Sequence, residues 1–148
     1  MSITRDTRPV DPEDQARREK LNALGKTLRD LHATLLKVVQ RDYETVHGPV
    51  GGPLKLFGLV TGDPFFVWLR PLSGQMALID ERIDDKVKLE TSDLEGIRGA
   101  VEALFKPSKD SPEGFASNYH ARVESEPTVT GLHAELRGRL EALSQELA

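Results

Sequence analysis

The feature that most constrains the fold is a long run of aliphatic side chains spaced alternately three and four residues apart. The run lies within residues 11–47 and consists of Leu21, Leu24, Leu28, Leu31, Leu35 and Val38. Because an α-helix has about 3.6 residues per turn, this spacing places them on one face. Asp11 before Pro12 is typical of a helix start, and the Gly48-Pro49 pair is typical of a helix end. We therefore predict one helix of about ten turns.

The remainder of the chain carries the same pattern in shorter segments. Further helices are predicted at residues 54–60, 63–85, 92–105, 115–123 and 127–147. Asp63-Pro64 repeats the start signal, and Ser92 with Glu95 matches a capping box. Pro71 lies inside the helix predicted for 63–85 and cannot donate a hydrogen bond to the carbonyl one turn earlier. We expect a kink or a short break at that position.

These helices predict the fold class and the domain organisation. No segment alternates apolar and polar residues as a half-buried strand does, so the chain is predicted to be all-α. A length of 148 residues fits one domain. We expect a disordered polar leader at 1–10 and a single domain at 11–148. That domain is predicted to be an antiparallel helical bundle of four main helices plus one or two short helices.

One segment resembles a known group of proteins. DPFFVWLRPLSG, with YETVHGPV before it and IDERIDD after it, resembles segments of uncharacterised bacterial helical proteins. The resemblance covers residues 28–85 and implies a bacterial source and an all-helical fold. It implies no activity and no site residue.

Composition excludes several classes of function. The chain has no cysteine, which removes disulfides, thiolate metal ligands and a thiol nucleophile. A net charge of −4, with lysine and arginine mixed among the acids, offers phosphate backbones no general attraction. The N-terminal sequence lacks the apolar core of a secretory signal, and no uncharged apolar run is long enough to span a bilayer. We expect a cytoplasmic protein that binds neither nucleic acid nor membrane.

Asp42 falls near the middle of the apolar face of the first helix. An ionised carboxylate facing a core needs a counter-ion, and Arg122 lies on the apolar face of the helix predicted for 115–123. We expect the two to pair inside the bundle, so that removing one partner alone would destabilise the protein strongly. The other interpretation is a small-ligand pocket lined by Asp42, Arg122, Tyr43 and His32, with Trp68 as an apolar wall.

Glu44 and His47 form a Glu-x-x-His pair, the spacing by which one helix supplies two ligands to a metal in helical bundles. Asp80 could add an oxygen to such a site. The usual pattern contains this pair twice, and the sequence contains it once. Glu44 also falls opposite the apolar stripe of its helix. We therefore expect no metal and no other cofactor, and keep this set as an alternative.

The sequence contains no recognisable catalytic motif, so no catalytic residue is predicted. The helix predicted for 63–85 carries a second apolar side, formed by Val67, Pro71, Gly74 and Leu78. It is either the central element of its own bundle or a helix that offers its outer side to a second copy of the chain. The function predicted is non-enzymatic: self-association, as a homodimer, or binding of another protein. The alternative is a bundle that binds a small ligand or a metal.

Overall fold

The computed structural model describes residues 11–107 and 114–145 of the chain. Within these ranges it contains seven helices and no strand, which confirms the prediction of an all-α protein. None of the helices described is both long and apolar enough to cross a membrane. The predicted leader at 1–10 and the last two residues of the helix predicted at 127–147 lie outside the described residues.

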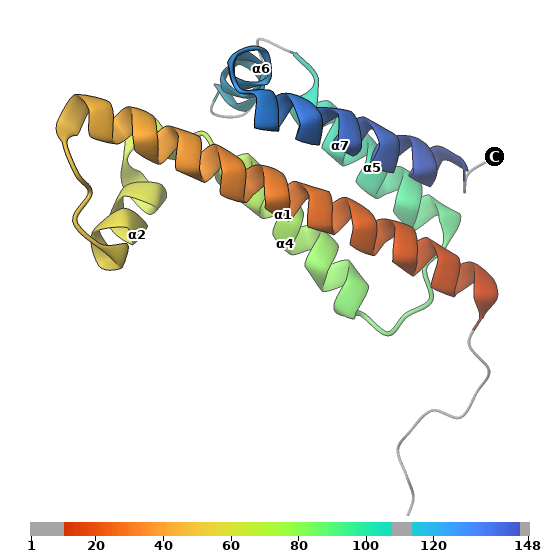
Figure 1. Ribbon diagram of the computed structural model, residues 1–148. Coiled ribbons are helices and arrows are strands. Elements are labelled where there is room, and N and C mark those ends of the chain that lie inside the picture. Colours follow the sequence, from red (N-terminus) through yellow and green to blue (C-terminus); the bar gives the residue numbers. More distant parts are fainter. Residues whose placement is uncertain (1–10, 108–113, 146–148) are drawn as a thin grey trace, which may run out of the picture.

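α1 (Pro12–His47) is the longest helix and extends along the whole molecule (Figure 1). The Asp11 carboxylate accepts hydrogen bonds from two backbone N–H groups of the first turn, as predicted. Gly48 follows the last turn with a φ of 85°, a conformation that favours glycine. The predicted stripe from Leu21 to Val38 is buried. Local signals therefore define both ends and the inner face of α1.

Three helices follow where the sequence predicts two. α2 (Pro53–Gly62) is followed by α3 (Pro64–Val67) and α4 (Arg70–Asp84). The Asp63 side chain caps α3 by accepting the backbone N–H two residues later, at 2.9 Å. The helix is then interrupted at Trp68 and Leu69, and Pro71 is the second residue of α4. The break expected from the missing N–H of proline is confirmed.

α5 (Thr91–Phe105) begins earlier than predicted. The predicted capping box that starts at Ser92 is wrong, because Glu90 is the cap and Asp93 is its partner. The Asp93 carboxylate accepts the backbone N–H of Glu90 at 2.8 Å and the guanidinium of Arg82 at 2.9 Å. The ion pair between Arg82 of α4 and Asp93 thus supports an earlier start of α5 than the sequence predicts.

α6 (Phe115–Ser125) and α7 (Pro127–Gln145) are joined directly at Glu126. The helix starts predicted near residues 115 and 127 are confirmed. The residues of α7 that are buried against the core are Val129, Leu136, Leu140 and Leu143.

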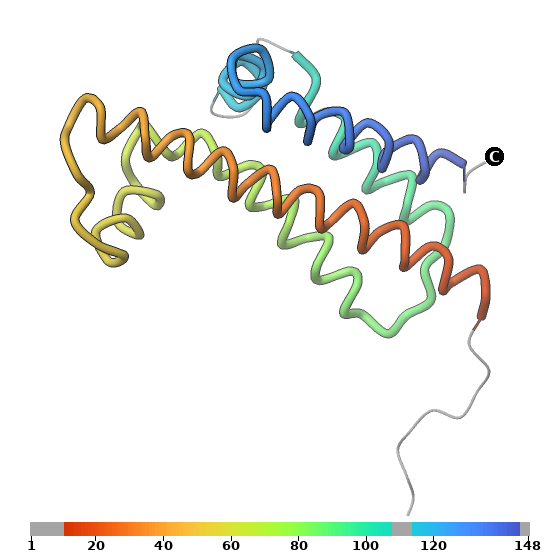
Figure 2. Tube along the Cα trace, viewed as in Figure 1, coloured from red at the N-terminus to blue at the C-terminus, as the bar shows by residue number. Residues whose placement is uncertain are grey.

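Packing is organised around α1, which contacts α7 on one side and α4 on the other. α5 contacts both α4 and α7, and α6 packs against α5 and α7. In Figure 2 the chain runs along α1, returns along α4, and runs back along α5 before returning along α7. α2 lies at one end of the molecule, where it packs against α3, apart from the long helices (Figure 1).

The connection between α4 and α5 is tied to the first turns of α1. Arg18 donates to the carbonyl oxygens of Ile83 and Val87 at 2.8 and 2.7 Å. The Asp14 carboxylate accepts the backbone N–H of Leu89 at 2.6 Å, and this bond lowers its pKa below the usual value. Buried Leu89 then closes the core at this end of the molecule.

Candidate functional site

Asp42 and Arg122 meet, but at the edge of the molecule. A carboxylate oxygen of Asp42 lies 3.6 Å from a guanidinium nitrogen of Arg122. The two side chains are 36% and 22% exposed, respectively, so the expectation of a pair inside the bundle is wrong. Arg41 also contacts Asp42, at 3.1 Å, and reaches Glu126 at 2.8 Å. The acid therefore belongs to a partly solvated network of charges.

The other predicted pocket residues contact different parts of the molecule. The guanidinium of Arg122 lies 5.3 Å from the ring centroid of buried Trp68, within the range of a cation–π contact. Tyr43 packs against the rings of Phe65 and Phe66, with centroids 5.5 and 5.6 Å away. The structure thus brings Trp68 to the predicted charge pair, whereas Tyr43 connects α1 to α3.

His32 lies on its own, away from these contacts. Its Nε2 is 3.0 Å from the Ser73 hydroxyl of α4, and burial lowers the pKa of the imidazole. The ten residues that separate His32 from Asp42 along α1 correspond to about 15 Å. The predicted pocket residues line neither the hollow on the outer face of α1, nor the groove between α4 and α5, nor the cavity where α5, α6 and α7 meet.

The alternative metal set does not come together. Glu44 accepts the backbone N–H of Val50 at 3.2 Å, and the His47 ring packs against the Tyr43 ring in a tilted arrangement, with centroids 4.5 Å apart. Asp80 contacts Arg29 at 3.5 Å, which lies fifteen residues before Glu44, or about 22 Å along α1. The described part of the chain contains no group of three or more potential metal ligands.

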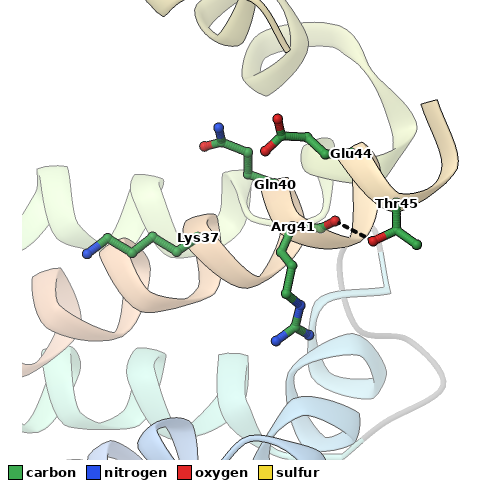
Figure 3. Close-up of a pocket in the computed structure, with 5 residues that line it drawn as sticks. All are labelled: Lys37, Gln40, Arg41, Glu44 and Thr45. Atoms are coloured by element: carbon green, nitrogen blue, oxygen red, sulfur yellow. Dashed lines mark hydrogen bonds between the residues drawn. The ribbon is translucent and has the colours of Figure 1, made fainter. Parts of the chain in front are cut away.

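The outer face of α1 carries a polar hollow near its C-terminal end. All the residues that line it come from this one helix: Lys37, Gln40, Arg41, Glu44 and Thr45. Figure 3 shows Gln40 and Glu44 pointing away from Arg41, while the Thr45 hydroxyl donates to the Arg41 carbonyl oxygen. With no second element to enclose a ligand, this face is open surface.

α2 is an apolar helix that the rest of the chain leaves largely uncovered. None of its residues is buried. Leu56, Leu59 and Val60 are partly buried and pack against the core. On its other side, the side chains of Leu54 and Phe57 are 89% and 68% exposed. Leu54 and Phe57 are three positions apart in the helix, so they share one outward face.

A second apolar surface lies between α4 and α5. It is a groove of about 650 Å³ lined by Pro71, Gly74, Gln75, Leu78, Ala100, Ala103 and Leu104. None of these lining residues is charged, and Leu78 is 60% exposed. The second apolar side predicted for the helix at 63–85 therefore forms one wall of an open groove.

Comparisons with known proteins were made for the whole chain. No family model, curated protein or solved structure matches it. The resemblance to bacterial helical proteins stays a prediction.

Of the two apolar surfaces, the sequence predicts the one on α4, which lines the groove. It does not predict that the outward face of α2 is exposed. The second apolar stripe of residues 63–85 was visible as a spacing pattern. The segment at 54–60 was recognised as an apolar helix, but nothing in its sequence states whether other helices cover it. A mostly apolar helix flanked by the glycines of positions 51–52 and 62 is the signal that was available.

Proposed function

We propose that the protein is a non-enzymatic interaction protein that associates with a second copy of itself. In this proposal α1, α4, α5 and α7 form an antiparallel four-helix bundle. The outward face of α2 in each copy, formed by Leu54 and Phe57, lies in the α4–α5 groove of the other copy. The observation that carries the proposal is that Leu54 and Phe57, two large apolar side chains of α2, are exposed to solvent.

The energetics allow a reversible dimer. Burying one leucine or phenylalanine side chain is worth about 1.5–3 kcal/mol, so four such side chains across a symmetric dimer contribute roughly 6–12 kcal/mol. Association itself costs about 4–15 kcal/mol in lost motional freedom. The groove residue Leu78 adds further apolar contact. The most favourable combination of these ranges leaves about 8 kcal/mol, which corresponds to a micromolar dissociation constant, so we expect a reversible dimer and not a permanent complex.

A second copy fits these surfaces better than an unrelated partner. One chain supplies both a protruding apolar helix and a recessed apolar groove, and a two-fold axis uses each of them twice. Lys55 is the one charged residue of α2, and the groove lining carries none. Charges that would select a different partner are therefore missing from the residues that form the contact.

The alternative of a ligand pocket at Asp42 has less support. Asp42 and Arg122 already contact each other at a solvated edge, and His32 and Tyr43 bind elsewhere. A pocket at this place would have to break existing contacts before it could hold a ligand.

Sedimentation velocity over a range of concentrations tests the proposal. We expect the wild type to sediment as a reversible dimer at tens of micromolar. The double variant Leu54→Gln with Phe57→Gln should weaken association at least about a hundredfold, because it removes the outward apolar face. Both side chains are exposed, so the fold should persist, as circular dichroism would show.

The matched control is Val87→Gln, which changes another apolar side chain, 62% exposed, outside the proposed contact. This variant should associate like the wild type. A wild type that remains monomeric at several hundred micromolar, or a double variant that still dimerises normally, would contradict the proposal.

A further inference from the structure

A separate cavity lies where α5, α6 and α7 meet. Its volume is about 340 Å³, near the lower end of the range typical of small-molecule sites. The polar residues that line it include His120 of α6 and His133 and Arg137 of α7. Phe105 and Leu136 are among its apolar lining. The cavity therefore combines an apolar wall with several nitrogen donors.

Hydrogen bonds determine which nitrogen of His133 carries the proton. The Tyr119 hydroxyl lies 2.8 Å from His133 Nδ1. In the described part of the chain Nδ1 is the one hydrogen-bond partner of this buried hydroxyl, so the phenol donates to Nδ1 and neither group is left unsatisfied. Burial, and then the charges of His120 and Arg137, lower the pKa of His133. Neutral His133 therefore carries its proton on Nε2, which remains available as a donor.

His120 is held in the same way by the other wall. Its Nε2 lies 2.7 Å from the carbonyl oxygen of Phe105, and a carbonyl oxygen only accepts hydrogen bonds, so this nitrogen is the protonated one. The His120 and His133 rings lie 5.8 Å apart between centroids. Both rings are thus oriented before any ligand enters.

Within the described part of the chain, the lysine and arginine side chains that line the cavity are unpaired, whereas its acidic side chain is paired. Glu102 lines it but is paired with Arg98 at 3.0 Å. Lys106 and Arg137 also line it, and neither side chain makes an ion pair or hydrogen bond within the described part of the chain. An uncompensated lysine and arginine beside a neutral imidazole N–H form a site for an anion.

We infer that this cavity binds a small carboxylate with an apolar body. The carboxylate is held by Arg137, Lys106 and the Nε2–H of His133, and the body packs against Phe105 and Leu136. The volume is sufficient for an acid with a single ring. This site is independent of the proposed dimer contact, which lies on α2, α4 and the other side of α5.

Calorimetric titration with benzoate, alongside its neutral analogue benzamide and inorganic phosphate, tests the inference. Benzoate should bind with a dissociation constant of about 1 mM or lower, and benzamide at least about tenfold more weakly because it lacks the charge. Phosphate should also bind more weakly, since it has no apolar body. Benzoate should shift the imidazole nitrogen resonances of His133 in NMR spectra.

Two variants identify the site. Arg137→Gln should weaken benzoate binding about tenfold without changing stability, because Arg137 is exposed and unpaired in the described structure. Lys37→Gln removes a cation from the outer face of α1 and should leave binding unchanged. Equal binding of benzoate and benzamide, equal binding of phosphate, no shift at His133, or an Arg137→Gln variant that binds normally would overturn the inference.

Discussion

Asp42 lies where the apolar face of α1 leaves the helices that cover it. Three residues earlier Val39 is fully buried, whereas four residues later Val46 is 66% exposed. Helical stepping predicted the direction of Asp42 and its partner Arg122, because both depend on local geometry. It could not predict depth, since depth depends on where the neighbouring helices end.

The exposure of this pair changes the expected effect of mutation. Asp42→Leu should lower the free energy of unfolding by less than about 1 kcal/mol, because solvent screens a partly exposed ion pair. Arg122→Met should cost somewhat more, since it also loses the contact with Trp68. Urea unfolding of the two single variants and the double variant checks this. A loss of about 3 kcal/mol in Asp42→Leu, recovered in the double variant, would instead indicate a buried pair.

His133 is a second residue for which the sequence predicts the direction of the side chain but not its surroundings. It lies four residues after Val129 and three before Leu136, so helical spacing places it beside the apolar stripe of α7. That position was a signal of an inward polar group. Its partner Tyr119 lies on another helix, and the carbonyl of Phe105 belongs to a third. No local pattern indicates that these groups converge.

Among the helices, the ends set by local chemistry were predictable and the end set by a tertiary contact was not. The caps at Asp11 and Asp63 and the break before Pro71 each depend on residues close in sequence. The start of α5 depends on Arg82 of α4, which binds Asp93. The packing of α4 against α5 therefore favours the capping box of Glu90 and Asp93 over the one predicted at Ser92.

The two assignments of the α5 start predict different mutational effects. Asp93→Ala should lower the free energy of unfolding by about 1–2 kcal/mol, because it removes both the cap partner and the ion pair. Ser92→Ala should change it by less than about 0.5 kcal/mol, as expected of an exposed position away from the cap. Thermal or urea unfolding of both variants distinguishes them. A larger loss in Ser92→Ala than in Asp93→Ala would restore the capping box predicted from sequence.

For the whole molecule, the question is what covers the apolar surfaces of α2 and α4. The sequence left open whether the second side of residues 63–85 faces other helices of its own chain or a second copy. In the described structure α5 borders this side without filling it, and Leu78 is left 60% exposed. The number of apolar sides on a helix does not show which partner covers them, because it does not show how many helices of the same chain pack against that helix.

Cross-linking between two labelled forms of the chain tests the proposed contact most directly. The chain has no cysteine, so single cysteines can be placed beside each surface without altering it. Gly58 in α2 and Gly99 in α5 both have open space around the position of an added Cβ. Gly99 lies one turn before Ala103 and therefore borders the groove. Gly138 in α7 has the same open surroundings and serves as the control.

A Gly58→Cys chain carrying a tag is mixed with an untagged Gly99→Cys chain and treated with a short bis-maleimide. If the α2 face of one copy lies in the α4–α5 groove of the other, the mixed cross-linked product should dominate over both self-linked products. Replacing the Gly99→Cys chain by a Gly138→Cys chain should then abolish the mixed product. A mixed product no more abundant than that of the Gly138→Cys control would contradict the account.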